Sequence, residues 1–207
     1  MSPRIIDKKE RQKEIALVAL DLFAEKGFEA TSISNVAKAA GIGKGTVYEY
    51  FSSKEELIAE AFMVWIDQMM GQDVDELLAN IEDPEQRLRV FVQAMMEAFI
   101  HDERSVKMTI STFQMMLQSG LESAHHHQFR RVFYTMWELL DAVLLDGVKQ
   151  GSFRPEITRE VRTVSVNMMA YLDGIAFHYM VNKDEIDVMA QVNFYLDRLI
   201  HYLKIPK

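Results

Sequence analysis

The sequence predicts an all-α fold of about nine helices. Through most of the 207 residues, apolar side chains recur at spacings of three and four, which is the pattern of amphipathic helices. Four prolines and nine glycines leave little room for repeated strands and turns, and no internal repeat is present. Hydrophobic residues make up 49% of the chain, so we expect a core that serves one medium domain or two small ones.

The first helix is expected over about residues 8–26. Gly27 should end it as a left-handed cap, with Phe28 folding back onto it. The apolar face of this helix consists of Ile15, Ala19, Leu22 and Phe23.

Residues 41–54 predict a short helix with almost no apolar side chains to bury. Only Val47 and Phe51, one turn apart, form an apolar face, so this helix cannot be stable alone. The segment before it provides a support, because it repeats apolar residues at helical spacing until Gly41 breaks it for a tight turn. Helix, glycine turn and short helix form a helix-turn-helix, in which the second helix enters the DNA major groove. The supporting helix presents Ile33, Val36, Ala37 and Ala40.

The side chains of the short helix suit contact with DNA. Lys44 supplies a charged donor, and Gly45 lets the backbone approach closely because it has no side chain. Hydroxyl groups that suit phosphates and base edges belong to Thr46, Tyr48 and Tyr50.

The helix that follows also begins with DNA-binding chemistry. Ser53 and Glu56 have the spacing of a capping box, which predicts the start of a helix. Lys54 lies in its first turn, where free N–H groups already favour an anion such as a phosphate.

Residues 10–58, about a quarter of the chain, resemble the DNA-binding domain of the TetR family of bacterial transcriptional repressors. The matching runs are 15–17, 22–28, 31–33, 36–42, 44–48, 50–51 and 54–57. The resemblance implies that Ser32 caps the helix before the turn and contacts a backbone phosphate, and that Lys54 binds phosphate. The DNA-binding residues expected from motif and resemblance together are Ser32, Gly43, Lys44, Gly45, Thr46, Tyr48, Tyr50 and Lys54.

Two residues depart from the pattern of that family. The family often has serine where this chain has Gly43, so a capping hydroxyl that can also touch phosphate is missing. Glu49 puts an acid on the DNA-facing surface. It either accepts a hydrogen bond from a cytosine amino group or points away between contacts, and the sequence alone leads us to favour the second.

Six further helices complete the predicted fold. Asp83 and Pro84 predict one of their starts, as N-cap and first helical residue. The resulting division is a helix-turn-helix DNA-binding domain with a basic N-terminal arm at residues 1–56, and a helical ligand-binding and dimerisation domain at residues 57–207. The helices are expected over about 54–79, 84–101, 103–118, 122–150, 158–181 and 186–203.

The charge distribution is compatible with DNA binding although the formal net charge is −8. Residues 1–56 hold nine basic and nine acidic residues, so the excess of acid lies in the rest of the chain. Residues 1–13 carry five basic residues against two acidic ones. This arm either follows phosphates and enters a minor groove or is a solvated tail.

The last two predicted helices are apolar over broad faces, and the resemblance implies that they form half of a four-helix dimer interface. Burial inside one subunit is the alternative. A dimer would place two reading helices about one DNA turn apart, so the operator should be palindromic. The interface residues expected are Val164, Met168, Leu172, Ile175, Tyr179, Val192, Leu196, Leu199 and Leu203.

Fourteen methionines, many of them interleaved with aromatic residues, suggest a pocket that adapts to apolar ligands. For each single residue an ordinary core position is the alternative, and it is the resemblance that favours a cavity for an inducer. The lining residues expected are Met95, Phe99, Phe113, Met116, Phe133, Met136, Trp137, Met168, Met169 and Tyr171.

Metal binding is not expected. The consecutive residues His125, His126 and His127 point about 100° apart on a helix and cannot share one ion. Glu122 and His125 have Glu-x-x-His spacing, but a di-iron bundle needs two such motifs and further glutamates. The absence of cysteine excludes disulfides and thiolate metal sites.

These patterns favour a homodimeric, sequence-specific repressor that binds a palindromic double-stranded DNA operator and is released by an apolar small molecule. An activator or architectural DNA-binding protein of the same fold stays open, and a metal-dependent helical-bundle enzyme is disfavoured because no nucleophile with a base is present. We expect no enzymatic activity and no cofactor. Without a membrane-length apolar run or a signal-peptide core, a cytoplasmic bacterial location without a membrane partner is expected.

Overall fold

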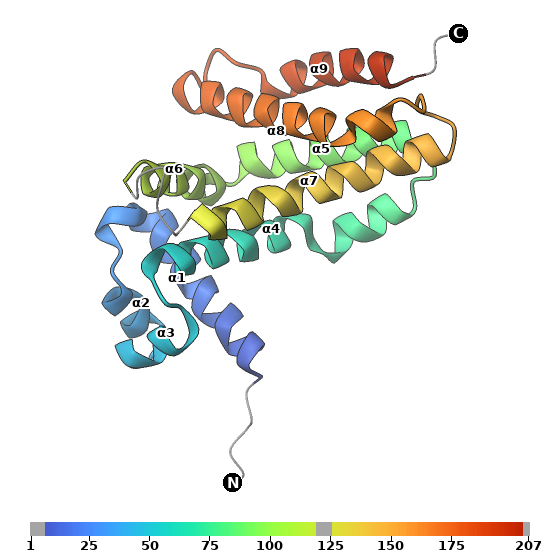
Figure 1. The fold of residues 1–207 in the computed structure, drawn as a ribbon. Helices are drawn as coiled ribbons and strands as arrows, with labels where there is room; N and C mark the ends of the chain where they lie inside the picture. Colours follow the sequence, from blue (N-terminus) through green and yellow to red (C-terminus); the bar gives the residue numbers. More distant parts are fainter. Residues whose placement is uncertain (1–6, 119–125, 205–207) are drawn as a thin grey trace. The chain divides into compact units, whose positions relative to one another are not determined.

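The computed structural model describes residues 7–118 and 126–204, and it leaves out the side chains of residues 69–77, 79, 112, 113, 116, 118, 126–129, 131 and 132 (Figure 1). The all-α fold class is confirmed, and the predicted helix bounds from α4 onwards agree within two residues wherever residues are described. None of the described helices has the length and hydropathy needed to cross a membrane. The described residues form α1 (Lys8–Ala30), α2 (Ile33–Ala39), α3 (Lys44–Tyr50), α4 (Lys54–Ala79), α5 (Pro84–His101), α6 (Glu103–Gln118), α7 (His126–Lys149), α8 (Ile157–Val181) and α9 (Val188–Leu203).

Contacts divide the chain into two compact units. Unit 1 contains Met1–Met69 and Asp102–Val132, and unit 2 contains Met70–His101 and Phe133–Lys207. The division predicted after residue 56 separates DNA binding from ligand binding and dimerisation, and it stays a prediction. The contacts nevertheless group α6 with the helix-turn-helix, whereas the predicted division includes it in the C-terminal domain.

In unit 1, α6 packs along α1 and is joined to it by a buried hydrogen bond. The Ser111 hydroxyl donates to the Phe23 carbonyl at 3.0 Å, and Ser111 is 1% exposed. The Trp65 indole donates to the Ser105 hydroxyl at 3.0 Å, which anchors α4 to the start of α6. Each buried serine therefore has a partner, as buried polar groups require.

The break in α1 at Gly27 has the positive φ that was predicted, but a different conformation. Its φ is 78° and its ψ is 171°, which is extended and not left-handed helical. The chain then continues for a short helical stretch to Ala30. Phe28 folds back as expected and stacks on Phe23 with 6.1 Å between ring centroids.

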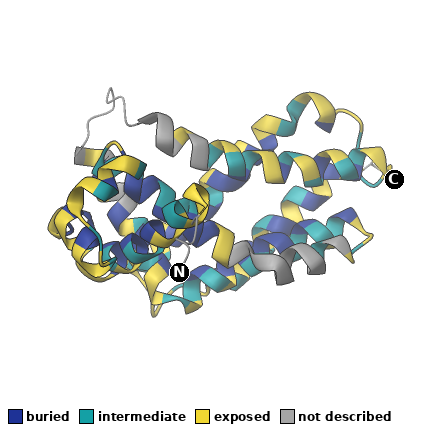
Figure 2. Cartoon of the chain, turned by 90° about the horizontal axis from the view of Figure 1, so that it is seen from below, coloured by how far each residue is buried: buried dark blue, intermediate teal, exposed yellow. Residues whose placement is uncertain are grey.

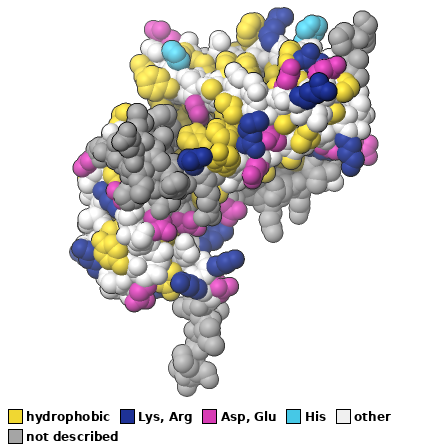
Figure 3. All heavy atoms as spheres, in the orientation of Figure 1, with side chains coloured by type: hydrophobic (Ala, Val, Ile, Leu, Met, Phe, Trp, Pro, Cys, Tyr) yellow, Lys and Arg dark blue, Asp and Glu magenta, His cyan; other side chains and the backbone are white. Residues whose placement is uncertain are grey.

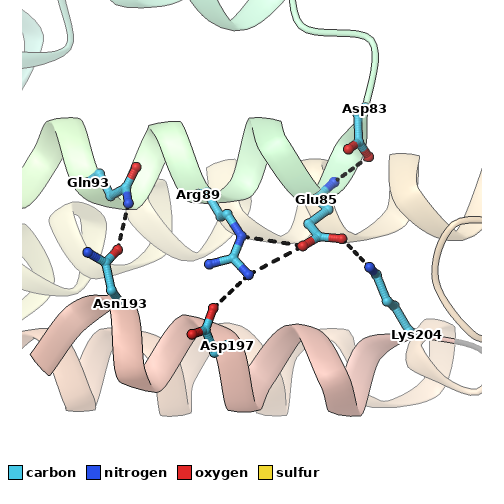
Figure 4. A network of polar contacts seen from close by, with 7 residues as sticks. All are labelled: Asp83, Glu85, Arg89, Gln93, Asn193, Asp197 and Lys204. Carbon is cyan, nitrogen blue, oxygen red and sulfur yellow. Dashed lines mark hydrogen bonds and ion pairs between the residues drawn. The ribbon is translucent and has the colours of Figure 1, made fainter. Parts of the chain in front are cut away.

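In unit 2, the buried residues lie on the sides at which the helices face one another (Figure 2). A polar network joins α5 to α9 along one edge (Figure 4). Arg89 forms ion pairs with Glu85 at 3.3 Å and with Asp197 at 2.8 Å, while Lys204 also pairs with Glu85. The hydrogen bond from Lys204 and the charges of both cations lower the pKa of Glu85, against the opposing effect of burial.

The connection between α7 and α8 is fixed by Phe153. Gly151 turns the chain with a φ of 75°, and the Phe153 side chain then lies 1% exposed against Gly147 of α7. Phe153 pairs with Lys204 as an isolated antiparallel bridge, and the Arg154 N–H donates to the Leu203 carbonyl at 2.8 Å. The connection therefore holds the C-terminal end of α9.

Candidate DNA-binding surface

The support for the short helix is α2, and it begins with the predicted cap. The Ser32 hydroxyl accepts from the backbone N–H of Asn35 at 3.2 Å, and the Asn35 side chain accepts from the Ser32 N–H at 2.9 Å. This capping box confirms the capping role of Ser32. The asparagine was not singled out from the sequence, although its spacing from Ser32 is the signature of such a box.

The turn between α2 and α3 is closed by backbone hydrogen bonds. The N–H of Ile42 donates to the carbonyl of Ala37 at 3.0 Å and that of Gly41 to Lys38 at 3.2 Å. Gly41 has a φ of 65°, which only glycine adopts without strain. The predicted break at this glycine is confirmed, and it gives α3 its direction.

The faces of α3 differ sharply in burial. Val47 and Phe51 are 0% and 1% exposed, which confirms that they form the inner face. Thr46 and Tyr50 are half-buried, whereas Lys44, Gly45 and Tyr48 are exposed. Gly43 is the N-cap and is also exposed, and no side chain caps the first turn. The predicted DNA-binding residues of this helix thus lie on its surface.

One flank of α3 combines a cation and an aromatic ring. The Lys44 ammonium lies 5.9 Å from the centroid of the Tyr48 ring, and Tyr48 is 49% exposed. Such an exposed pair offers a charged donor and a hydroxyl to a phosphate or a base edge.

Lys54 is held in place at the start of α4. Its ammonium lies 4.0 Å from the Phe28 ring centroid and 3.5 Å from the Glu29 carbonyl oxygen. Burial lowers the pKa of Lys54, while the charges of Glu29 and Glu55 raise it. The cation is therefore oriented by unit 1 itself before any phosphate arrives.

The capping box at the start of α4 differs from the prediction in one partner. The Ser53 hydroxyl accepts from the Glu56 N–H at 3.1 Å as expected. The Glu56 carboxylate, however, accepts from the N–H and the hydroxyl of Ser52, both at 2.6 Å. The carboxylate reaches one residue further back because Ser52 offers two donors.

Eight of the ten predicted ligand residues lie in unit 2, on α5, α7 and α8, whereas Phe113 and Met116 lie on α6 of unit 1. Tyr171 is directed towards α9, since its ring stacks on Tyr195 at 4.0 Å and its hydroxyl donates to the Gln191 carbonyl. Phe133 and Trp137 are half-buried, and the side chains of Phe113 and Met116 lie outside the described residues. The buried ones are Met95, Phe99, Met136, Met168 and Met169.

Most residues predicted for the dimer interface are covered by their own protomer, which is the alternative raised from the sequence. Ile175, Tyr179 and Leu199 are half-buried. A side chain that is buried within its own protomer can contribute little contact area to an interface. A second protomer that packs on these helices would therefore contact mainly other residues. The predicted interface residues that are buried within the protomer are Val164, Met168, Leu172, Val192, Leu196 and Leu203.

Of the histidine run, His125 and the side chains of His126 and His127 lie outside the described residues. Within the described part of the chain, no three histidine, aspartate or glutamate side chains are grouped as a metal site.

Comparisons with known proteins agree with the fold. Residues 15–61 match the bacterial regulatory proteins of the tetR family, and residues 66–202 match the C-terminal region of YsiA-like proteins. The transcriptional repressor KstR2 of Rhodococcus jostii is 30% identical over 154 residues, which cover 74% of this chain and 73% of that protein.

Two further similarities extend over nearly the whole chain. The fatty acid metabolism regulator protein of Bacillus subtilis is 23% identical over 196 residues, covering 93% of this chain and 95% of that protein. The crystal structure of FadR from Bacillus subtilis in complex with stearoyl-CoA superposes with a TM-score of 0.72 at 22% identity, covering 92% and 98% of the two chains.

The helix-turn-helix and these matches define a DNA-binding transcriptional regulator. The chain belongs to the TetR family, and its C-terminal region is of the YsiA-like type.

Proposed function

We propose that the protein is a homodimeric repressor that binds a palindromic operator in the bacterial cytoplasm and is released by a fatty acyl-CoA. The observation that supports DNA recognition most directly is α3, whose polar residues stand on a buried base of Val47 and Phe51. Repression is supported by the name of the relative KstR2. The palindrome follows from the proposed dimer, since two-fold symmetry requires two equivalent half-sites.

The proposed dimer surface is the outward side of α8 and α9. On α8, Val166, Phe177 and Val181 are 37%, 56% and 66% exposed and share one side with Ala170 and Gly174. On α9, Phe194 is 62% exposed. Figure 3 shows hydrophobic side chains reaching the surface over these helices, among charged ones. Small residues beside large apolar ones permit close helix packing, which suits a second copy of the same surface.

The proposed effector follows from the similar proteins and from the interior of unit 2. FadR of Bacillus subtilis was crystallised with stearoyl-CoA, and the fatty acid metabolism regulator matches almost the whole chain. The buried methionines of α5, α7 and α8 provide the adaptable apolar environment that an acyl chain requires. An effector of this kind acts only if it binds the DNA-incompetent state more tightly.

The first experiment selects bound sites from a random DNA pool at physiological salt. The proposal requires an enriched palindrome. Stearoyl-CoA is then titrated into the complex with the selected site, with free CoA and stearate as controls, while fluorescence anisotropy reports release. Release by stearoyl-CoA alone supports the proposed effector. If none of the three releases the DNA, the effector is wrong while DNA recognition stands.

A pair of variants tests the dimer surface. Phe177→Asp should give monomers in light scattering and weak operator binding, because bivalency is lost. Leu139→Asp is the matched control, since Leu139 is 38% exposed on α7 and lies outside the proposed surface. A stable dimer of Phe177→Asp would place the interface elsewhere.

A further inference from the structure

The seven residues of α3 and its C-cap Phe51 fall into four pairs, and the members of each pair are one helical turn apart. Val47 and Phe51 form the buried base of the helix. Lys44 and Tyr48 form one exposed flank, in contact with each other. The other flank consists of Thr46 and Tyr50, which are half-buried.

The fourth pair, Gly45 and Glu49, occupies the outermost face of α3. At about 100° per residue, both positions lie roughly opposite Val47, between the two flanks. Gly45 is exposed, and a Cβ built on it would have no heavy atom within 4 Å. Glu49 is exposed as well, and no described residue forms a hydrogen bond or ion pair with its carboxylate. The face of α3 that would enter a major groove first therefore consists of the exposed backbone at Gly45 and the carboxylate of Glu49, which is unpaired within the described part of the chain.

From this arrangement we propose that Glu49 accepts a hydrogen bond from the amino group of a cytosine in each half-site and so determines the base at that position. This reverses the preference drawn from the sequence alone, since Glu49 cannot point away from DNA while its flanking pairs contact it. The inference rests on the DNA binding of the protein and not on the proposed dimer surface or effector.

The chemistry of the groove selects cytosine. A carboxylate close to phosphates is repelled unless it meets a hydrogen-bond donor, and the base donors in the major groove are the amino groups of cytosine and adenine. Adenine also presents N7, an acceptor that repels a carboxylate, directly beside its amino group. Gly45 assists because a helix without a side chain there can approach the base pairs closely.

The test compares sites selected from a random DNA pool by the full-length protein and by Glu49→Ala. The parent should enrich a cytosine at one position of each half-site. Glu49→Ala should lose the preference at that position only, because Glu49 is exposed and takes no part in folding contacts among the described residues. Measured on paired operators, the parent should bind cytosine over thymine by roughly tenfold or more at that position, and the variant should bind both about equally.

A second variant tests whether the loss of a negative charge outside α3 changes the selected sequence. Glu25→Gln removes one negative charge from an exposed position of α1 and should leave the selected sequence unchanged. If Glu49→Ala selects the same sequence as the parent, or if the parent prefers adenine or no particular base there, Glu49 does not read cytosine and the proposal is overturned. A melting curve like that of the parent confirms that each variant is folded.

Discussion

Replacing Gly147 of α7 by alanine should destabilise unit 2, although alanine is the better helix former. A Cβ at this position would lie 2.1 Å from Cδ2 and 2.4 Å from Cε2 of the Phe153 ring. Both distances are far below van der Waals contact. The ring cannot move aside freely, because Phe153 is 1% exposed and its backbone pairs with Lys204.

The magnitude follows from two opposing terms. Overpacking of a tight core costs about 1–3 kcal/mol, whereas glycine to alanine in a helix gains up to about 1 kcal/mol. A Cβ 2.1 Å from a confined ring is a severe overlap, so the overpacking cost should lie in the upper half of its range, at about 2–3 kcal/mol. The net loss should then be roughly 1–2 kcal/mol, which lowers the Tm of a chain of this size by about 2–8 °C. Urea unfolding and thermal melting followed by circular dichroism measure both quantities.

The control is Gly174→Ala in α8, where an added Cβ meets no heavy atom within 4 Å of the protomer. At concentrations at which the protein is monomeric, that variant should be as stable as the parent or slightly more so. A smaller residue at the Phe153 position should also relieve part of the cost, so Gly147→Ala combined with Phe153→Leu should be less than additive. A Gly147→Ala protein as stable as the parent would refute the packing argument.

Three further results are expected. Lys54→Ala should weaken operator binding equally for all sequences and reduce the salt dependence by about one released ion per subunit, measured by anisotropy at several salt concentrations. Ser111→Ala should cost about 1–3 kcal/mol in urea unfolding, because the buried Phe23 carbonyl loses a donor. Glu85→Gln should cost less than about 1 kcal/mol at pH 7, since its partner Lys204 is half exposed. Because the pKa of Glu85 is lowered in the folded state, its stabilisation is complete above the ordinary glutamate value of about 4 and is lost as the pH falls further. The difference between Glu85→Gln and the parent should therefore vanish in acid, as melting curves between pH 3 and pH 7 would show.

Local signals in the sequence predicted the helices well. Pro84 and its cap Asp83, whose side chain accepts from the Glu85 N–H at 3.1 Å, mark the start of α5 through contacts within three residues. The turn at Gly41 and the cap at Ser32 are equally local. Such features depend on neighbouring residues, so the sequence contains what is needed to predict them.

Tertiary placement could not be predicted in the same way. Ser111 resembles a solvated helix position, and its burial depends on a carbonyl 88 residues earlier in the chain. On α8 and α9 apolar residues occur on several sides, so periodicity does not distinguish the side that packs inwards from the side that stays exposed. For the same reason, the interface predicted from the sequence includes residues such as Leu196, which the protomer itself buries completely.

The uncapped start of α3 has a consequence for how the affinity of this regulator can change. Gly43 has a φ of −71° and a ψ of 148°, which any residue adopts. A Cβ there would meet only the Thr46 hydroxyl, at an ordinary 3.8 Å. Serine would therefore fit without strain and supply the capping hydroxyl that this helix lacks. If this position contacts a phosphate of the operator, as the sequence predicts, a single substitution here would raise the affinity for DNA without any change in the fold.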